Sequence, residues 1–253
     1  MPIMAERIAT RLYLTEALAA GDSITLGPPA VHRLRDVLRL GPGAAIAAFN
    51  PRDGEWLCRI GEMTRGRAAL EVVARRRPPE REGNIWLLFA PIRRTRLDWL
   101  VEKATELGVS ALLPIATART QVPQTSPARL EAVAIAAAEQ CERLSVPEFR
   151  PAAPLAMALA GWPADRQLLV CDESGGGRPI TEELTLIEQG APTALLVGPE
   201  GGFTPTELDA FADLPFVSRV GLGPRILRAE TAAVAALAVF QAIAGDWRKA
   251  RAR

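Results

Sequence analysis

Short apolar or alternating runs separated by turns fill the first 74 residues of the chain. Alternation of apolar and polar positions with a period of two is typical of strands that bury one face. Several short strands in succession favour a small β-barrel. The predicted strands are Arg11 to Leu14, Ile24 to Leu26, Ala44 to Phe49, Glu55 to Ile60 and Ala68 to Ala74.

One helix is predicted between the second and third of these strands. It begins near Pro28 and Pro29, because proline is favoured in the first turn of a helix, and it ends before Gly41-Pro-Gly43. The face opposite its apolar stripe bears Arg35 and Arg39. Helical spacing predicts that the buried stripe consists of Val31, Leu34, Val37 and Leu38.

A predicted linker follows the last of these strands. Residues 75–83 read RRRPPEREG, and this density of proline, glycine and charge is typical of a domain boundary. We therefore expect two domains, a barrel over residues 1–77 and a second domain over residues 78–253.

Beyond the linker, near-continuous apolar runs alternate with helical patterns. Such runs predict an α/β domain with a mostly parallel sheet that is covered on both faces. The predicted strands are Ile85 to Ala90, Ala111 to Ile115, Gln167 to Cys171, Ala194 to Val197 and Val217 to Val220. The predicted helices are an apolar stripe from Leu97 to Leu107 that Gly108 ends, then Pro127 to Cys141, Pro205 to Asp213 and Glu230 to Ala244.

A glycine-bearing loop follows the strand that ends at Val197. Val197 to Phe203 contains three glycines, and Thr204 to Glu207 has the cap and first-turn proline of a helix start. A glycine loop at the carboxyl end of a parallel strand favours a ligand site, because glycine lets the backbone approach a ligand closely. An ordinary strand-to-helix turn is the alternative. Neither GxGxxG nor GxxxxGK[ST] occurs, which disfavours dinucleotide and P-loop sites.

A second segment repeats this arrangement. Gly221 to Thr231 leads from a strand end with glycines, through Arg225 and Arg228, into a helix rich in small residues. Two glycine-bearing strand ends in one sheet favour a shared ligand site over two coincidental turns. Arg228 and Glu230 either act in that site or form a structural ion pair.

Both segments resemble the signature segments of a known family. Gly198-Pro-Glu-Gly-Gly202 and Ile226-Leu-Arg-Ala-Glu-Thr231 are similar to those of the 16S ribosomal RNA uracil-N3 methyltransferases, a family of the SPOUT superfamily. The similarity extends from about Arg11 to about Phe240. It also includes Val37 to Leu40, Lys103 to Val109, and Glu139-Gln140 with Arg143 and Pro147.

The resemblance implies a fold and a cofactor. It implies an N-terminal PUA-like barrel and a C-terminal SPOUT domain with a trefoil knot, acting as a homodimer. It also implies that the two segments hold S-adenosylmethionine, largely through backbone groups. The cofactor-binding residues so implied are Leu196, Val197, Gly198, Pro199, Glu200, Gly201, Gly202, Gly221, Leu222, Gly223, Ile226, Leu227, Arg228, Thr231 and Ala232.

Methyl transfer to uracil N3 would be an in-line displacement, so the main task of the protein is alignment of donor and acceptor. The N3 proton must also leave. Glu230 is a candidate to accept it and Arg228 is a candidate to stabilise the developing anion. Because N3 lies on the pairing edge, the target uridine must be unpaired or extruded. Two alternatives remain: a SPOUT methyltransferase acting on another RNA base or on ribose, and a non-catalytic RNA-binding assembly factor.

The charge distribution adds an RNA-binding hypothesis. The net charge is only +1, but residues 1–77 hold 12 basic and 8 acidic side chains. A basic front module suggests an anionic partner, here 16S ribosomal RNA or the small ribosomal subunit, although a charge run is often only a solvated face. The candidate RNA contacts are Arg11, Arg35, Arg39, Arg75, Arg76 and Arg77.

Composition excludes several other classes. A chain that is 49% hydrophobic and 23% charged is typical of a globular protein, and it has neither a membrane-spanning run nor a signal-peptide pattern, so we expect a cytoplasmic protein without a membrane partner. The cysteines, Cys58, Cys141 and Cys171, lack metal-ligand spacing and are predicted to be packed thiols. His32 is the only histidine, which disfavours a Ser-His-Asp hydrolase and a histidine-rich metal site.

Overall fold

The computed structural model describes residues 6–80, 82–120 and 126–248, and the chain divides into two compact units. The first unit comprises Met1–Arg81 together with Ala138–Ser145, and the second comprises Glu82–Ala137 together with Val146–Arg253. The first unit therefore includes a segment that lies far from it in sequence. The domain division after residue 77 stays a prediction, and Arg81 of the predicted linker lies outside the described residues.

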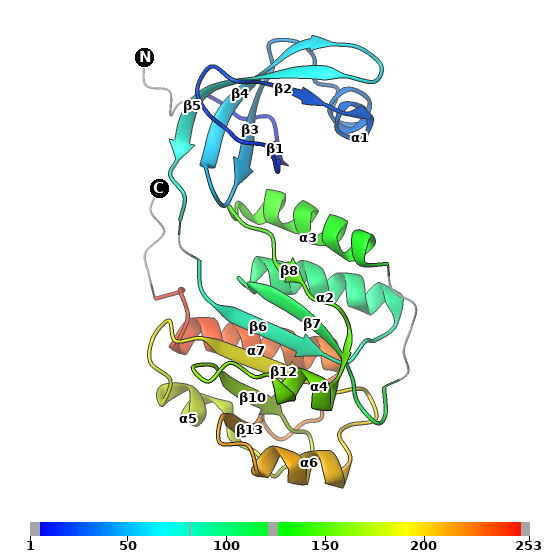
Figure 1. Cartoon of the computed structure of the whole chain (residues 1–253), viewed down its shortest axis with the longest axis vertical. Helices are drawn as coiled ribbons and strands as arrows, with labels where there is room; N and C mark the ends of the chain where they lie inside the picture. The colour runs from blue at the N-terminus through cyan, green and yellow to red at the C-terminus, as the bar shows by residue number, and fades with distance from the viewer. Residues whose placement is uncertain (1–5, 81, 121–125, 249–253) are drawn as a thin grey trace. The chain divides into compact units, whose positions relative to one another are not determined.

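The first unit is built on a five-stranded sheet that is curled into a half-barrel (Figure 1). The strand order is β1-β3-β4-β5-β2, with β1 parallel to β3 and the other pairs antiparallel. Every strand predicted for this module is confirmed, and its core includes Leu34, Ile46 and Leu70. The strands are β1 (Arg11–Tyr13), β2 (Ser23–Leu26), β3 (Ala45–Asn50), β4 (Gly54–Met63) and β5 (Ala68–Arg77).

Strand β5 continues through the residues predicted to begin the linker. Arg75 pairs with Trp56 and Arg77 pairs with Glu55 in the β4–β5 ladder. The prediction of a linker was therefore wrong at residues 75–77. Their charge does not end the strand, because the side chain of Glu55 lies opposite and accepts a hydrogen bond from Arg76 Nη1 at 2.8 Å.

The predicted helix is shorter than expected and changes its pitch. Helix α1 (Pro28–His32) continues as a π-helix, η2 (Arg33–Val37), and Arg39 has a φ of 57°. Leu34 is fully buried, but Val37 is 63% exposed and Leu38 is 38% exposed, so the predicted stripe is wrong at these two positions. A π-turn contains more residues than an α-turn and rotates later side chains off the buried face. The left-handed conformation at Arg39, rather than Gly41, ends the helical segment.

The second unit contains a parallel sheet with strand order β11-β13-β10-β12-β6-β7-β8, and β9 also pairs with β7. All five predicted strands are confirmed, whereas the two-residue strands β8, β9 and β11 were not predicted. The strands are β6 (Ile85–Phe89), β7 (Ala111–Ala116), β8 (Glu148–Phe149), β9 (Ala153–Pro154), β10 (Gln167–Cys171), β11 (Arg178–Pro179), β12 (Thr193–Val197) and β13 (Val217–Gly221).

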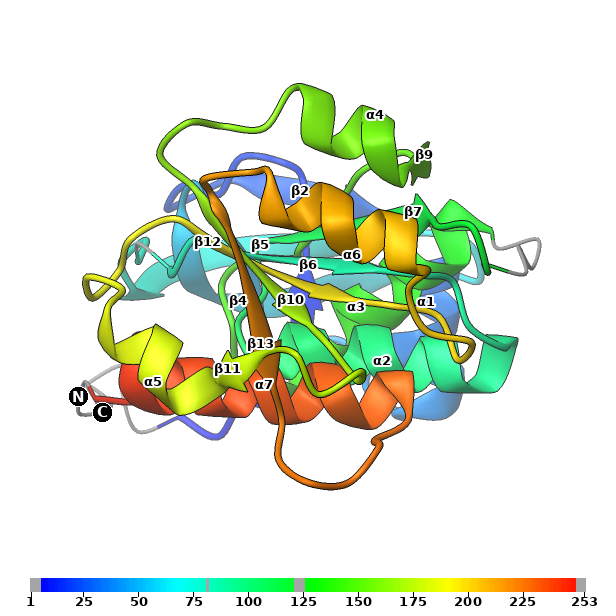
Figure 2. The same ribbon diagram turned by 90° about the horizontal axis from the view of Figure 1, so that it is seen from below.

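Helices cover both faces of this sheet. Figure 2 shows α4 and α6 on one face and α2, α5 and α7 on the other. Neighbouring residues of one strand accordingly enter different cores, as Leu195 and Leu196 do. Gly108, with a φ of +82°, follows α2 as predicted. The helices are α2 (Arg94–Glu106), α3 (Pro127–Cys141), α4 (Leu155–Ala160), α5 (Ile180–Thr185), α6 (Pro205–Ala212) and α7 (Ala229–Ile243). The threading that would make a knot stays a prediction of the resemblance.

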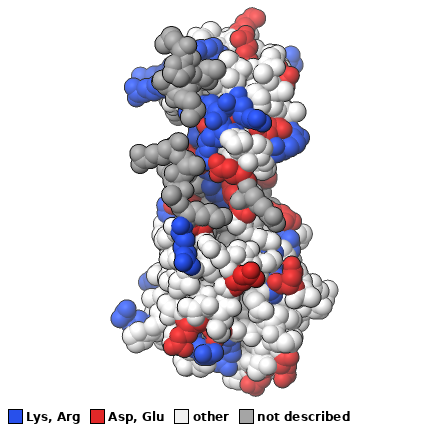
Figure 3. Space-filling view, turned by 90° about the vertical axis from the view of Figure 1, so that its left-hand side faces the viewer, with Lys and Arg blue, Asp and Glu red and all other residues white. Residues whose placement is uncertain are grey.

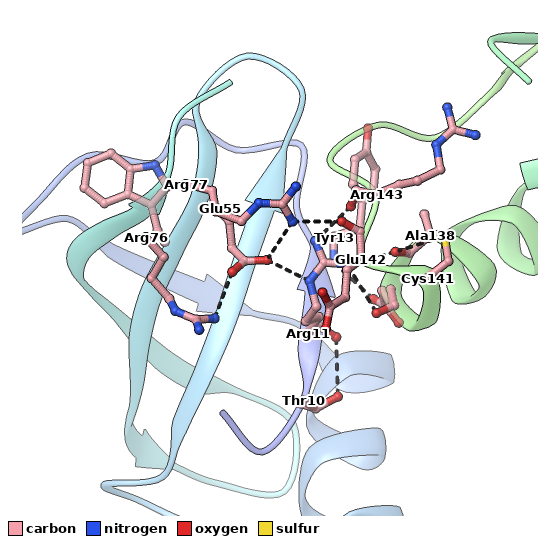
Figure 4. A network of polar contacts seen from close by, with 12 residues as sticks. Thr10, Arg11, Tyr13, Glu55, Arg76, Arg77, Ala138, Cys141, Glu142 and Arg143 are labelled. Carbon is pink, nitrogen blue, oxygen red and sulfur yellow. Dashed lines mark hydrogen bonds and ion pairs between the residues drawn. The ribbon is translucent and has the colours of Figure 1, made fainter. Parts of the chain in front are cut away.

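A buried ion pair anchors the segment Ala138–Ser145 within the first unit (Figure 4). Glu55 is 3% exposed and Arg11 is 9% exposed, and Arg11 Nε donates to Glu55 Oε2 at 2.8 Å. The rest of the Arg11 guanidinium donates to the carbonyl oxygens of Ala138 and Arg143, both at 2.8 Å. Burial lowers the pKa of Arg11, and Glu55 counteracts this shift. Arg11 therefore joins strand β1 to the carboxyl end of α3.

Glu139 makes a second connection between the same elements. Its Oε1 accepts a hydrogen bond from the backbone N–H of Tyr13 at 3.0 Å, and its Oε2 pairs with Arg33. Arg77 Nη1 also donates to the carbonyl of Glu142 at 2.9 Å. Arg11, which the sequence suggested as an RNA contact, is thus enclosed by protein groups, and we assign it a structural role.

Two cysteines are buried in separate cores, as predicted for packed thiols. Cys58 lies in the core of the first unit and Cys171 in the larger core of the second, and burial raises the pKa of each thiol to about 12. Neither thiol ionises near neutral pH. Among the described residues, no helix has both the length and the apolar character that crossing a bilayer requires.

The ion pair generates a stability prediction. Arg11→Met should lower the free energy of unfolding by about 3 kcal/mol, because it leaves Glu55 buried with fewer partners. Urea denaturation followed by circular dichroism measures this loss. Arg75→Met, in the same sheet but with an exposed side chain, is the control and should change stability by less than about 0.5 kcal/mol. Equal stabilities of the two variants would contradict a structural role for Arg11.

Candidate functional site

The carboxyl ends of four neighbouring strands lie at one edge of the parallel sheet. Strand β10 pairs in parallel with both β12 and β13, and β12 pairs in parallel with β6. The loops that follow these strands, at residues 90–93, 172–177, 198–204 and 222–228, therefore begin at the same edge. Both glycine segments identified from the sequence are among them, as expected for a shared site.

In the first glycine loop, two glycines are required by contacts within the protein. A Cβ at Gly198 would lie 2.8 Å from the ring of Phe203, which packs edge-on against Phe211. Gly202 has a φ of +69°, and a Cβ there would overlap the carboxylate of Glu173. Glu173 Oε1 accepts a hydrogen bond from the backbone N–H of Phe203 at 3.2 Å. At these two positions, glycine serves the close packing of the loop rather than the approach of a ligand.

The start of α6 holds the far end of this loop. The predicted helix cap is confirmed: Thr204 and Glu207 form a capping box, in which each side chain accepts a hydrogen bond from the backbone N–H of the other. Glu207 Oε1 also accepts from the backbone N–H of Ala118 at 2.9 Å, and Arg119 Nη1 donates to the carbonyl of Gly201 at 2.7 Å. The chain after β7 thus supports the glycine loop, a contact that the sequence did not predict.

The second glycine loop offers unused backbone donors. Within the described part of the chain, the backbone N–H groups of residues 222, 223 and 225–228 donate no hydrogen bond. Gly223 has a φ of +96°, and no atom lies within 4 Å of where its Cβ would be. Leu222 and Leu227 pack partly against the core, whereas Ile226 is 83% exposed. A loop with free N–H groups and apolar side chains can bind a ligand through its backbone.

A third glycine loop, which the sequence interpretation missed, follows β10. It contains Gly175-Gly-Gly177, and a Cβ at Gly177 would lie 2.6 Å from the backbone of Val220 in β13. Asp172 at its start binds Arg219 of β13 at 2.6 Å. Burial acts to raise the pKa of Asp172, but hydrogen bonds from Ser174 and Arg219 outweigh burial and lower it. The same rule, a strand followed by glycines, could have identified this loop.

One arginine connects the two predicted segments. Arg96, in the first turn of α2, has its Nη1 3.6 Å from Glu200 Oε1 and its Nε 3.5 Å from Glu230 Oε1. Glu230 therefore pairs with Arg96, and this pair replaces the one suggested between Arg228 and Glu230. Arg228 is the N-cap residue of α7 and its side chain is exposed. Nothing in the sequence distinguishes Arg96 from its neighbours Arg93 and Arg94 as this connection.

One carboxylate oxygen of Glu230 has no hydrogen-bond partner among the described residues. Its side chain is only 13% exposed, and its Oε2 is buried without a hydrogen-bond partner among the described residues. Buried polar atoms are nearly always hydrogen-bonded, and leaving one unpaired costs about 1–3 kcal/mol. Such an atom beside a loop with free N–H groups indicates a place for a polar group of a ligand.

The remaining predicted cofactor contacts differ in what they can offer. The side chains of Leu196 and Val197 are buried on opposite faces of the sheet, so only their backbone can reach a ligand. Thr231 is exposed in the first turn of α7, and the next residue, Ala232, is 8% exposed. Glu200 is exposed, while Pro199 is buried and accepts a hydrogen bond from the backbone N–H of Gly202. Gly221 ends β13 beside Gly177.

The candidate RNA contacts of the first unit are partly occupied by acidic partners. Figure 3 shows blue and red side chains adjoining one another in this unit. Arg35 pairs with Asp36 at 2.7 Å, and Arg76 and Arg77 both lie within 4.0 Å of Glu55. Arg39 and Arg75 are exposed and form no ion pair within the described residues.

Comparisons with known proteins match both units. A family model described as an RNA methyltransferase domain matches residues 79–241, and one described as an RNA methyltransferase PUA domain matches residues 30–73. The ribosomal RNA small subunit methyltransferase E of Rickettsia conorii is 30% identical over 229 residues, which cover 90% of this chain and 93% of that protein.

Solved structures agree with these matches. The ribosomal RNA small subunit methyltransferase E of Neisseria gonorrhoeae, bound to S-adenosyl methionine, is 31% identical with a TM-score of 0.82, covering 94% of this chain and 99% of its own. A methyltransferase structure from Legionella pneumophila with bound SAM is 28% identical with the same TM-score, covering 94% and 98%.

Proposed function

The chain belongs to the RNA methyltransferase family, and from this membership we propose that it methylates ribosomal RNA of the small subunit with S-adenosylmethionine as the methyl donor. More specifically, we propose that the target is N3 of a uridine in 16S ribosomal RNA. The observation that carries the proposal is the meeting of the two signature segments at one sheet edge, joined by Arg96. We also expect a cytoplasmic homodimer, as the resemblance implies.

The loops at this edge fit S-adenosylmethionine. The cofactor has hydroxyl and amino groups that donate hydrogen bonds and ring nitrogens that accept them, and it supplies an electrophilic methyl group on a sulfonium. The N–H groups of residues 222, 223 and 225–228, which have no hydrogen-bond partner within the described residues, match the acceptors. We propose that residues 196–202, 221–223, 226–228, 231 and 232 hold the cofactor, with Leu222 and Leu227 as its apolar contacts.

The chain's own residues then have two tasks. The first is to hold the uracil ring so that N3 lies in line with the transferring methyl group, which requires an unpaired or extruded base. The second is to manage the N3 proton. S-adenosylmethionine would supply the methyl group, whose bond to sulfur would break with its electron pair left on sulfur as N3 bonds to the methyl carbon. Glu230 Oε2 would accept the N3 proton. Arg228, whose guanidinium is exposed and forms no ion pair within the described residues, stabilises the negative charge that develops on the uracil oxygens.

The first unit offers a surface for RNA phosphates that differs from the set suggested by the sequence. Arg35 Nη1 donates to the carbonyl of Thr64 at 3.4 Å, so the end of η2 lies beside the β4–β5 turn. Arg39 follows η2, and Arg65 and Arg67 lie in the β4–β5 turn. All three are exposed and form no ion pair within the described residues. We propose that these three arginines contact phosphate, because cations without acidic partners are free to do so.

The function is tested by mapping 16S ribosomal RNA. Cells that lack the protein should lose one methyl group from one uridine, and restored cells should regain it. Mass spectrometry of nuclease fragments locates the group, and comparison with synthetic 3-methyluridine identifies the atom. A methyl group on ribose or on another base would identify a different SPOUT activity. Undetectable binding of S-adenosylmethionine in calorimetry would support a non-catalytic assembly factor instead.

The role of Arg228 can be separated from cofactor binding. Arg228→Ala should reduce kcat by about 100-fold or more, since it removes a donor to the developing anion, while the Kd for S-adenosylmethionine changes little. Single-turnover methylation of small subunits and calorimetry supply the two values. Arg225→Ala, an exposed arginine of the same loop, is the matched control. Unchanged turnover in Arg228→Ala would rule out this role.

The RNA surface is tested by salt dependence. Replacing Arg39, Arg65 and Arg67 with Gln should weaken binding to 16S ribosomal RNA and reduce the slope of log K against log salt by about 2 to 3. Filter binding at several salt concentrations measures both quantities. Arg52→Gln with Arg59→Gln is the control, because Asp53 and Glu6 already neutralise these arginines. A slope equal to that of the wild type would remove the assignment.

A further inference from the structure

We propose that Arg96 limits the negative charge around the methyl donor. The site then does not stabilise the bound, positively charged cofactor more than it stabilises the transition state. This inference rests on the proposed function. Arg96 pairs with one carboxylate in each cofactor segment. It acts as a positioning residue that sets the electrostatics of the site.

The contacts of Arg96 place one positive charge between two negative charges. Its Nη1 lies 3.6 Å from Glu200 in the first glycine loop, and its Nε lies 3.5 Å from Glu230 at the start of α7. The side chain of Arg96 is 33% exposed and that of Glu230 is 13% exposed, so solvent only partly screens the interaction between these two charges. The three side chains together carry a charge of −1, and without Arg96 they would carry −2.

This charge matters because the two states of the cofactor differ by one unit. S-adenosylmethionine has a positive sulfonium, and S-adenosylhomocysteine, which remains after transfer, has a neutral sulfur. Their other groups are the same. Two uncompensated carboxylates would stabilise the sulfonium before transfer more than in the transition state, where its charge is already falling, and would thereby slow the reaction. Arg96 keeps both carboxylates in place and reduces their combined field.

The inference predicts a change in the preference between the two ligands. In Arg96→Gln, the ratio of the Kd for S-adenosylhomocysteine to the Kd for S-adenosylmethionine should rise about 3- to 10-fold, as expected for one unit charge at several ångströms near a surface. Calorimetry with each ligand measures this ratio without any turnover. Because the ligands share their shape apart from one methyl group, a general loosening of the loops changes both values and largely cancels. The kcat of methyl transfer should fall in the same variant.

Three further variants make the test specific. Arg96→Lys retains the charge and should restore the ratio towards that of the wild type. Glu200→Gln removes a carboxylate from a side chain that is 51% exposed, so it should fold normally, and it should lower the ratio. Arg94→Gln, an exposed arginine of the same helix without an ion pair in the described residues, should leave the ratio unchanged.

The outcomes separate this inference from the function on which it rests. A wild-type protein that binds neither ligand would overturn the proposed function. A wild-type protein that binds both, with ratios that are the same in Arg96→Gln, Glu200→Gln and the wild type, would overturn the inference and leave the function standing. A ratio that rises in Arg96→Gln and falls in Glu200→Gln supports it, even if one of the variants is less stable than the wild type.

Discussion

The parallel pairing of β10 with both β12 and β13 is the constraint on which the site depends. It brings to one edge of the sheet two loops that are separated by 17 residues in the sequence, and it places a third glycine loop between them. The backbone of Gly177 packs closely on β13, and the ring of Phe203 packs closely on Gly198. These contacts fix the positions of the two loops. The loop after β13, whose N–H groups have no hydrogen-bond partner within the described residues, leads directly into α7, which carries Glu230.

Electrostatic contacts hold together the loops that the sheet brings to one edge. Arg96 joins the loop after β12 to the start of α7, as Arg119 and Glu207 join the chain after β7 to the first glycine loop. Among the described residues, no group of three or more His, Cys, Asp or Glu side chains suited to a metal ion is found. Charged side chains at the sheet edge hold the loops, and the loop backbone remains available for a ligand.

Periodicity was enough to predict the strands and most of the long helices, because burial on one or both faces sets the pattern of apolar residues. It failed where local geometry departs from the regular repeat. The π-helix that exposes Val37 and Leu38 cannot be recognised from the spacing of apolar residues. The continuation of β5 through Arg75 to Arg77 depends on Glu55, which is distant in the sequence. Likewise, the glycine segments could be identified from sequence, but the partner of Glu230 could not, because Arg96 and Glu230 are far apart in the chain and meet only through the fold.

The assignment of Ala138–Ser145 to the first unit has a consequence for synthesis and assembly of the protein. Arg11 and Tyr13 need groups on this segment to satisfy their hydrogen bonds, so the first unit is not complete when its own 81 residues have left the ribosome. The segment that completes it is made only after Glu82–Ala137, about a third of the second unit, has been synthesised. An amino-terminal fragment would therefore lack the groups on Ala138–Ser145 to which Arg11 donates its hydrogen bonds. The two units, though compact, are not independent in their order of folding.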